Sequence, residues 1–516
     1  MGLRVVAVSA PAYFEGRNGS ALNSKDPASL FNACRRAAYL ANTQSGPWGN
    51  SNWTVPRIRR RENLLLMYSA KEDMPEFEKL LEREKPNLLL IGAMTLCLPG
   101  AVACAERAKQ MFGDNICVVL GGKHVNETVY QDYRSGKILH HPGSPLRLMS
   151  EHRIKPVFDL IVSGEAEYVI AKIGEAVDSL DIHGVSVVKA KDYLCDFSSV
   201  PGRWIIGWLN GDSVSTINND IRLDRDLLPI PSEMFGVRTK FSVFPGRLTA
   251  HVFSDSGSGC IYDCNVCSES SSVAGFPVQT STSAQRLYKQ LECAAQMISS
   301  DSPGHKASAF VEDSILLGGS QASLNRLLGM LQNKPLDLVF GGQFTIDQAL
   351  NKMPILQELY QVSMNYIFIG LETEQPSLIG GMSKDHTSAT TEWLDRAEKL
   401  LYQLSRIGYS CGASLLFGLG ESRASRQRLF NRLNKWQQAF GMPKPISLNW
   451  AVQHPLKGND NGANYSYLEW GTPSGPLLRA FKDFGEASLR YPIFGQKPPT
   501  LEEVEEVLAM NRALSE

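Results

Sequence analysis

The segment Cys260-Ile-Tyr-Asp-Cys264-Asn-Val-Cys267 decides the interpretation of this chain. It follows the apolar, strand-like run 248–254, after the flexible stretch Ser256-Gly-Ser-Gly259. Thiolates are the preferred ligands of iron–sulfur clusters, and a short loop lets three of them converge on one cubane. Three ligands leave one iron of a [4Fe–4S] cluster open, so that a chelating substrate can bind there and take an electron. The spacing therefore predicts a cluster held by Cys260, Cys264 and Cys267.

A zinc site or a coincidence of spacing are the alternatives for this segment. A structural zinc site usually takes a fourth Cys or His nearby, and the next such residues are Cys293 and His305. The other seven of the ten cysteines are scattered, mostly in apolar strand or helix patterns. Disulfides are rare in a reducing cytosol, so we expect these seven to be small core residues.

In the second half of the chain, predicted strands and helices alternate on both sides of the cysteine segment. Between residues 241 and 455 this alternation predicts six strand–helix units, which form a partial (β/α)6 barrel. Residues 456–516 then form a loop-rich tail that ends in a helix over 500–514. The expected strands are 248–254, 308–312, 337–341, 365–371, 411–417 and 446–452, and the expected helices are 282–300, 320–333, 349–361 and 388–407.

The first 180 residues show a separate strand–helix alternation. Short apolar runs recur with helical patterns between them, which predicts a doubly wound, Rossmann-like α/β domain over 1–180. Residues 181–240 are turn-rich and include Asp226-Leu-Leu-Pro-Ile-Pro231, whose two prolines cannot lie inside a helix, so this stretch is expected to be an extended connector between the two domains. The expected strands are 3–9, 62–68, 87–93, 116–120 and 158–163, and the expected helices are 71–84 and 100–112.

At this point the sequence resembles the radical S-adenosylmethionine (SAM) superfamily, whose signature is a C-x3-C-x2-C loop after the first barrel strand. The resemblance implies that SAM chelates the open iron and is cleaved reductively to a 5′-deoxyadenosyl radical. The family usually has an aromatic residue just before the third cysteine, where this chain has Val266. The contact with adenine is therefore expected to differ.

Later strand ends carry further similarity to this family. Phe310-Val-Glu-Asp-Ser314 resembles the second-strand end that faces the methionyl amine, and acidic side chains there can accept bonds from an ammonium. Tyr366–Thr373 resembles the fourth-strand motif that ends in a glutamate, and Ser414–Glu421 resembles the fifth-strand glycine motif. Each motif alone is compatible with a helix cap or a turn. The resemblance rests on their occurrence in this order at successive strand ends. The resemblance implies SAM contacts for Glu312, Asp313, Ser314, Glu372, Ser414, Gly418 and Gly420. The substrate-pocket candidates are Gln343, Asp347, Asn449, Gln453 and His454, of which His454 is also compatible with a structural role.

The resemblance extends to the subgroup with an amino-terminal cobalamin-binding domain. It rests on Val118–His124, Phe158–Glu167 and the Leu227–Pro231 connector, and it implies that Thr95, Gly121 and Gly122 contact the corrinoid. A Rossmann-like domain without a corrinoid also needs glycine at such turns. No histidine precedes His124, so the usual D-x-H-x-x-G cobalt ligand is absent from the sequence. Cobalamin is therefore expected to bind without a lower histidine, or not at all.

Composition restricts the partners. The formal charge of −1 gives no electrostatic reason to expect nucleic acid, and no apolar run is long enough to span a bilayer. We expect a cytoplasmic enzyme that takes electrons from a donor such as flavodoxin or ferredoxin. Methylation of an unactivated centre of a small metabolite is the leading hypothesis. The alternatives are a rearrangement, cyclisation or oxidation without methyl transfer, and a non-catalytic corrinoid sensor.

Overall fold

The computed structural model divides the chain into two compact units. Unit 1 comprises Met1–Phe235 and Pro455–Gly471, and unit 2 comprises Gly236–His454 and Thr472–Glu516. The tail beyond residue 455 is thus shared between the two units. The structure describes residues 3–15, 64–132, 134–179, 195–221, 223, 238–239, 241–252, 254, 259–275, 277, 282–379, 390–457, 460–472, 475–481 and 483–514.

Unit 1 is built on a seven-stranded sheet with strand order β2-β1-β3-β4-β7-β8-β9. Its first five strands are parallel and read as continuous apolar runs, as expected for strands that are buried on both faces. Helices cover both faces, as in a doubly wound sheet. The strands are β1 (Val5–Ser9), β2 (Leu64–Leu66), β3 (Leu88–Gly92), β4 (Cys117–Gly121), β7 (Leu160–Gly164), β8 (Gly202–Asn210) and β9 (Ser213–Ile221); the main helices are α3 (Ala70–Glu84), α4 (Leu98–Phe112), α5 (Lys123–Thr128), α6 (Pro145–Ser150) and α7 (Glu167–Ser179), with a small β5 (Val129–Gln131) and β6 (Ile138–His140) hairpin.

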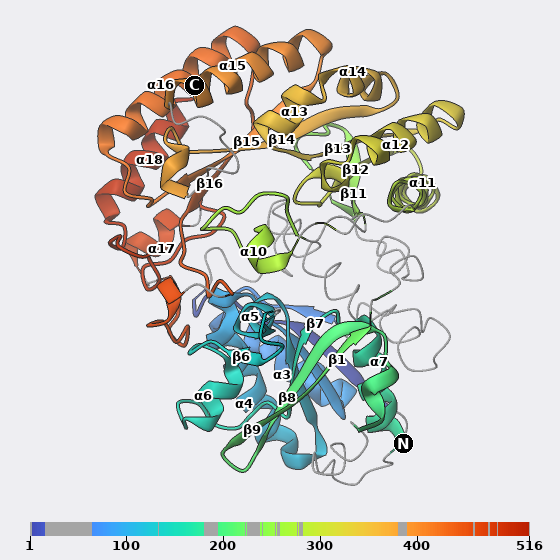
Figure 1. The fold of residues 1–516 in the computed structure, drawn as a ribbon, viewed down its shortest axis with the longest axis vertical. Helices are drawn as coiled ribbons and strands as arrows, with labels where there is room; N and C mark the ends of the chain where they lie inside the picture. The colour runs from blue at the N-terminus through green and yellow to red at the C-terminus, as the bar shows by residue number, and fades with distance from the viewer. Residues whose placement is uncertain are drawn as a thin grey trace. The chain divides into compact units, whose positions relative to one another are not determined.

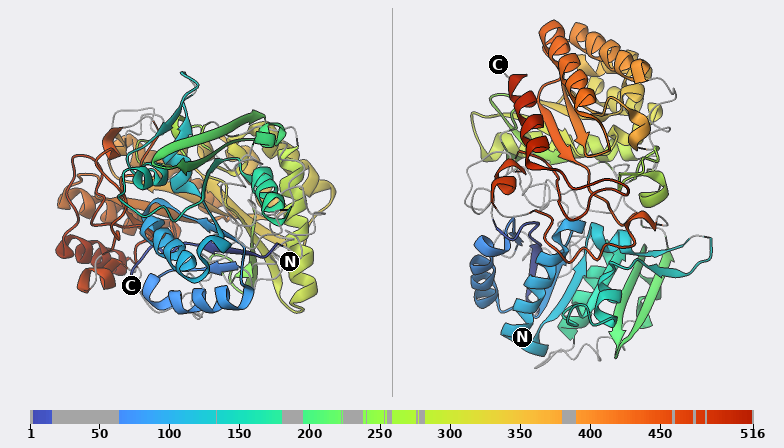
Figure 2. Two further views of the ribbon diagram at one scale, coloured as in Figure 1. Left: turned by 90° about the horizontal axis from the view of Figure 1, so that it is seen from below. Right: turned by 90° about the vertical axis from the view of Figure 1, so that its left-hand side faces the viewer.

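The antiparallel hairpin β8–β9 lies within the stretch that the sequence analysis expected to be a turn-rich connector. The two nine-residue strands extend the first sheet beyond residue 180, along the edge drawn in green in Figures 1 and 2. Gly211, at a φ of 61°, opens the two-residue turn between them. The Leu227–Pro231 part of the expected connector lies outside the described residues.

Unit 2 is built on a second seven-stranded sheet, in which six consecutive strands are parallel and a short antiparallel strand lies at one edge. Helices pack on its outer side, so the sheet forms a parallel half-barrel (Figure 1). The mixed α/β class predicted from the sequence is confirmed. The strands are β10 (Arg238–Thr239), β11 (Arg247–Val252), β12 (Lys306–Val311), β13 (Leu338–Phe344), β14 (Met364–Glu372), β15 (Ser410–Phe417) and β16 (Ile446–Trp450); the helices are α10 (Ser271–Ala274), α11 (Ser283–Asp301), α12 (Gln321–Asn333), α13 (Ile346–Asn351), α14 (Met353–Gln361), α15 (Thr390–Ile407), α16 (Arg423–Phe440), α17 (Pro476–Phe481) and α18 (Leu501–Ala513).

The two faces of the second sheet differ in burial. On β14 and β15 the residues that face the helices, such as Ile369 and Leu415, are fully buried. The alternate residues, such as Phe368 and Ser414, are only half-buried toward the carboxyl ends of the strands. Phe244, Phe310 and Tyr366 form one aromatic cluster, with Phe310 the penultimate residue of β12 and Tyr366 near the start of β14. The half-buried residues of β14 and β15 lie toward the carboxyl ends of the strands, the end at which the cysteine segment follows β11.

Candidate iron–sulfur site and its surroundings

The three cysteines lie in one short loop, in which the backbone directs N–H groups at two of the sulfurs. The Tyr262 N–H donates to Cys260 Sγ at 3.5 Å, and the Glu269 N–H donates to Cys267 Sγ at 3.4 Å. The loop also closes on itself through the Cys267 N–H and the Cys264 carbonyl oxygen, 3.3 Å apart. N–H donors stabilise the charged form of a group that accepts from them, so this loop favours thiolates at both positions.

The cysteine loop is anchored to two later strand ends of the same sheet. The Tyr262 hydroxyl lies 3.1 Å from Thr345 Oγ1, directly after β13. Val266, the residue before the third cysteine, packs in an apolar cluster with Leu419 after β15 and Ala451 after β16. The loop therefore lies over the carboxyl ends of the parallel strands, where α/β folds bind ligands.

The donor set fits a [4Fe–4S] cluster. None of the three cysteines forms a disulfide bond; Cys264 is buried, while Cys260 and Cys267 are half-buried. Within the described residues, no three Cys, His, Asp or Glu side chains gather where one metal ion could bind. A [4Fe–4S] cluster does not require three ligands around one metal ion, because each thiolate binds a different iron of the cluster.

Buried cysteines elsewhere have the opposite environment. Cys104, Cys117 and Cys411 are completely buried, and burial raises the pKa of each thiol far above its usual range. They remain protonated and act as small core side chains, as the sequence predicted for the scattered cysteines. Cys97 is also buried, whereas Cys293 is half-buried. Cys34 lies outside the described residues.

At the end of β12, Glu312 pairs with a histidine of the neighbouring strand. Glu312 Oε1 lies 2.8 Å from His251 Nδ1, and both side chains are almost completely buried. By strand alternation His251 shares the inner face with Thr249, which contacts Ser308 at 2.9 Å. This pair is one that the sequence analysis missed; its only signal was a histidine within the apolar run of the first barrel strand.

The Asp313 carboxylate is completely buried and is held by three donors of the protein. It accepts from the Ser254 N–H at 2.7 Å, from the Leu317 N–H at 2.9 Å and from the Ser254 hydroxyl. Burial raises the pKa of Asp313 to about 6, against the lowering effect of these donors. The carboxylate thus ties the segment before the cysteine loop to the end of β12. Ser314, the next residue, is half-buried.

The candidates after β13 and β14 fall into two groups. Gln343 and Glu372 are half-buried on the inner face. Glu372 has a φ of 61°, a left-handed conformation that costs a non-glycine residue energy and is concentrated at ligand sites. Asp347 instead pairs with Arg396 on α15, with 3.0 Å between Oδ1 and Nε.

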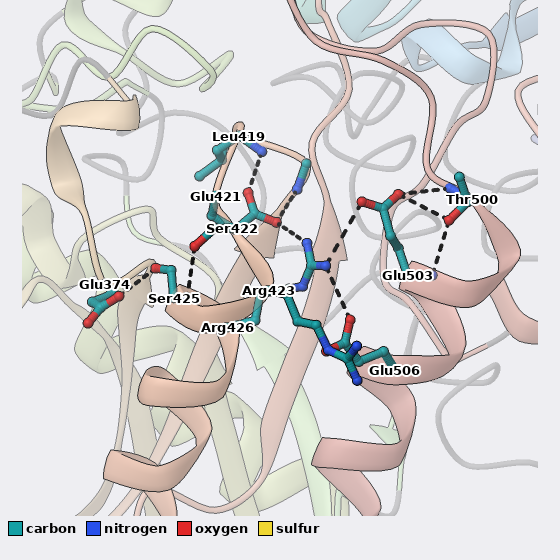
Figure 3. A network of polar contacts seen from close by, with 11 residues as sticks. Glu374, Leu419, Glu421, Ser422, Arg423, Ser425, Arg426, Thr500, Glu503 and Glu506 are labelled. Carbon is teal, nitrogen blue, oxygen red and sulfur yellow. Dashed lines mark hydrogen bonds and ion pairs between the residues drawn. The ribbon is translucent and has the colours of Figure 1, made fainter.

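The glycine loop after β15 is held by Glu421. Its two carboxylate oxygens accept from the Gly418 N–H at 3.0 Å and the Leu419 N–H at 2.8 Å (Figure 3). Gly418 has a φ of 78°, and a Cβ there would lie 2.2 Å from Nε1 of Trp450. Glycine at 418 is therefore required by packing as well as by conformation. Ser414 is half-buried on the inner face, and Gly420 is exposed.

The candidate residues around β16 also differ in burial and in the groups that they contact. Asn449 is half-buried, and its amide donates to the Leu415 carbonyl oxygen at 3.3 Å. Gln453 is buried: its amide nitrogen donates to the His454 carbonyl oxygen, and its amide oxygen accepts from the Phe494 N–H. His454 lies 3.8 Å from Glu486. Gln453 and His454 thus bind parts of unit 2 itself.

In unit 1, the strand-end candidates belong to a buried polar network. The Thr95 hydroxyl donates to Glu127 at 3.2 Å, and His124 Nδ1 lies 3.4 Å from the same hydroxyl. His124 Nε2 lies 3.0 Å from the Gly143 carbonyl oxygen, which can only accept, so this nitrogen carries a proton. The His124 ring is completely buried and packs edge-on against Tyr467.

The glycine pair after β4 has a packing role of its own. A Cβ at Gly122 would lie 2.7 Å from both the backbone nitrogen and oxygen of Ala93, and its φ is 99°. At Gly121 a Cβ would come only within 3.4 Å of the Val162 oxygen. The Ala93 N–H donates to the Gly121 oxygen at 3.0 Å, so this turn fixes the ends of β3 and β4 together.

Two large apolar side chains are exposed after the adjacent strands β1 and β3. Phe14 is 51% exposed and Met94 is 42% exposed. The strand order changes direction between β1 and β3, which makes their carboxyl ends the switch point of the sheet. Exposed apolar surface at a switch point is where a flat organic cofactor can bind.

No protein-family model and no curated protein matches the chain. Its neighbours among solved structures are cobalamin-dependent radical SAM enzymes, together with other radical SAM enzymes. The cobalamin-dependent SAM radical enzyme OxsB, with aqua-cobalamin and SAM bound, is 13% identical with a TM-score of 0.48; the similarity covers 84% of this chain and 52% of OxsB. This chain therefore matches about half the length of OxsB.

A second neighbour is the radical SAM methyltransferase TsrM from Kitasatospora setae, with cobalamin and a [4Fe-4S] cluster bound. It is 11% identical with a TM-score of 0.48, and the similarity covers 87% of this chain and 75% of TsrM. Methylornithine synthase (PylB) is 13% identical with a TM-score of 0.30, over 53% of this chain and 83% of that one. At 11–13% identity and TM-scores below 0.5, these similarities do not identify the reaction or the substrate of this chain.

Proposed function

We propose that this chain is a radical SAM enzyme whose [4Fe–4S] cluster is bound by Cys260, Cys264 and Cys267. The observation that carries the proposal is the loop in which N–H groups donate to Cys260 and Cys267, at the carboxyl ends of a parallel half-barrel. When bound, the cluster supplies one electron to the sulfonium of chelated SAM, which splits into methionine and a 5′-deoxyadenosyl radical. The electron comes from an external donor of the flavodoxin or ferredoxin class.

The half-buried inner-face residues are proposed to hold SAM and the substrate. Glu372, strained and accessible, accepts from the ribose hydroxyls or the methionyl amine. Glu312 offers a carboxylate whose orientation is fixed by His251. Gln343, Ser414 and Asn449 are available for a small substrate, since all three are half-buried on the same face. Asp313 acts indirectly, by holding the segment before the cysteine loop.

Unit 1 is proposed to bind cobalamin with no protein imidazole on the lower face of the ring. The exposed Phe14 and Met94 at the switch point offer apolar surface to the macrocycle. His124 cannot serve as the axial donor in this arrangement, because its Nε2 proton is directed at the Gly143 oxygen and the ring is buried. The Co(II) resonance spectrum of the loaded protein should show no nitrogen superhyperfine splitting from the protein; such splitting would contradict this assignment.

Methyl transfer to an unactivated carbon or phosphorus centre of a small metabolite is the reaction we propose for the two cofactors together. A rearrangement, cyclisation or oxidation is the competing outcome. The two differ in product mass, because methylation adds one carbon. A non-catalytic corrinoid sensor would cleave no SAM.

The test is reductive cleavage of SAM by the anaerobically reconstituted protein. We expect 5′-deoxyadenosine to form with a chemical reductant, slowly even without substrate, and not to form with the Cys260→Ala/Cys264→Ala/Cys267→Ala variant. A Glu372→Ala variant should retain its iron and lose most of this turnover. Absence of 5′-deoxyadenosine from protein that carries the cluster would overturn the proposed function.

A further inference from the structure

The loop between β15 and α16 is held in place by one buried carboxylate. Glu421 accepts from the N–H groups of Gly418 and Leu419 through both of its oxygens, and its side chain is 6% exposed. Ser422 then caps α16 by accepting from the Ser425 N–H at 3.2 Å. The conformation of the loop therefore depends on where the Glu421 carboxylate is held.

Arg426 connects this carboxylate to the carboxyl-terminal helix α18. Its guanidinium lies 3.5 Å from Glu421, 3.2 Å from Glu506 and 3.9 Å from Glu503 (Figure 3). The Arg426 side chain is 5% exposed and that of Glu506 is 14% exposed. Charge pairs shielded from water in this way are coupled more strongly than surface pairs, and removal of one partner leaves an uncompensated buried charge.

Helix α18 has its own supports, so it can serve as the fixed end of this connection. Thr500 and Glu503 form a reciprocal capping box at its start. Its apolar face, with Val504, Val507 and Leu508, is buried in the core of unit 2. The position of Glu506 is therefore set by helix packing rather than by Arg426.

The other end of the connection reaches the cysteine loop. Leu419, whose N–H is bonded to Glu421, is buried in the cluster that also contains Ala451 and the half-buried Val266. Val266 immediately precedes the third cysteine. A continuous series of contacts thus runs from α18 through Arg426, Glu421 and Leu419 to the cysteine loop.

We infer that Arg426 is a positioning residue for SAM: it transmits the position of α18 to the Gly418–Glu421 loop, which packs beside the cysteine loop through Leu419 and Val266 and is proposed to contact the nucleoside half of SAM there. This inference rests on the proposed function and adds to it the carboxyl-terminal helix as a determinant of affinity for SAM. Arg426 touches neither SAM nor the cluster.

The experiment compares cluster-loaded wild type, Arg426→Met and Arg426→Lys. The matched control is Arg432→Met on the same helix, whose guanidinium pairs with Asp395 and Glu398 on α15. Dissociation constants are measured for SAM and for 5′-methylthioadenosine, which keeps the nucleoside and lacks the methionyl carboxylate. We expect Arg426→Met to weaken both ligands by about tenfold, with iron content and the maximal rate at saturating SAM unchanged, and Arg426→Lys to recover part of the affinity. Arg432→Met should bind both ligands like wild type.

The outcomes separate the two proposals. Wild type that carries the cluster and binds no SAM contradicts the proposed function. Wild type that binds SAM while Arg426→Met binds it equally well contradicts the role of Arg426, as does a loss confined to SAM with 5′-methylthioadenosine unaffected. If Arg426→Met does not fold, Glu506→Gln removes the same pair with its size conserved, and it should weaken both ligands by several-fold; unchanged affinity there would also overturn the inference.

Discussion

The carboxyl ends of the two parallel sheets carry similar kinds of residue in different states. In unit 1, Thr95, His124 and Glu127 are buried and bonded to one another or to backbone. In unit 2, the cysteine loop follows β11 with two of its three cysteines half-buried, and Glu372 and Ser414 are half-buried on the inner face. The residue types alone do not distinguish the carboxyl ends of the strands in unit 1 from those in unit 2. The difference shows that the residue type at a strand end does not by itself determine whether the side chain is buried or accessible.

The same contrast exists within unit 2, at the end of β12. Asp313 and Glu312 are neighbours in sequence, and both were expected to face the methionyl amine. Three donors of the protein converge on Asp313, whereas Glu312 pairs with one ring nitrogen of His251. Both oxygens of Asp313 are therefore held by groups of the protein, whereas the orientation of Glu312 is fixed by a histidine on the neighbouring strand.

The contrast between loop and core cysteines gives the largest expected effect. Cys264→Ala should reduce iron and sulfide from about four of each per chain to well below one, because a cubane needs all of its protein thiolates. Cys411→Ala, in the middle of β15, should keep full iron content, since its thiol is completely buried and its pKa is raised. Iron and sulfide analysis after anaerobic reconstitution checks both variants. Equal iron in the two would break the distinction between cluster and core cysteines.

The next largest effect is expected on the free energy of unfolding, from substitutions at Gly122 after β4 and Gly420 after β15. A Cβ at Gly122 meets backbone atoms of Ala93, whereas a Cβ at Gly420 meets the end of the Gln496 side chain, which can move. We expect Gly122→Ala to lower the free energy of unfolding by about 3 kcal/mol and Gly420→Ala by about 1 kcal/mol, the cost of the left-handed conformation alone. Denaturant unfolding followed for each variant measures the two values. A larger loss for Gly420→Ala would mean that its loop is packed more rigidly than Gln496 suggests.

The pH dependence contributed by Asp313 gives a smaller effect than Gly122→Ala. Its pKa is raised from 3.8 to about 6 in the folded chain, chiefly by burial, so the folded state holds the proton more tightly than the unfolded state. Protonation therefore stabilises the fold, and this stabilisation is lost as the pH rises through about 6. Between pH 4.5 and 7 the unfolding free energy of wild type should fall by about 2 kcal/mol relative to Asp313→Asn. A constant difference across this range would mean that Asp313 does not titrate there.

Much of the fold could be predicted, because most strands of both sheets are parallel and are apolar runs with helices between them. The expected strand 365–371 corresponds to β14 (Met364–Glu372), and the expected helix 282–300 corresponds to α11 (Ser283–Asp301). The expected helix 349–361 is two helices, α13 and α14, because Pro354 lies in the first turn of the second. The β8–β9 hairpin was missed because β9 alternates polar residues, although Gly211-Asp212 is a hairpin-turn signal.

The candidate site was predictable to the extent that it is local in sequence. The cysteine spacing lies within eight residues, and the structure adds N–H donors that only the folded loop reveals. Contacts between distant segments could not be predicted. Arg426 with Glu506 joins residues 80 apart, and His251 with Glu312 joins residues 61 apart. Asp347 was proposed as a pocket residue because it follows a strand, and its ion pair with Arg396 on α15 is a further contact that the sequence could not predict.

The central claim is that the loop Cys260–Cys267 holds a [4Fe–4S] cluster with one iron open to SAM. The direct measurement is the electron paramagnetic resonance spectrum of the reduced, reconstituted protein, recorded with and without SAM and accompanied by iron and sulfide analysis. The account predicts about four irons and four sulfides per chain, the signal of a reduced [4Fe–4S] cluster, and a shift of that signal when SAM is added. A single bound zinc ion, or a cluster signal that SAM leaves unchanged, would contradict it.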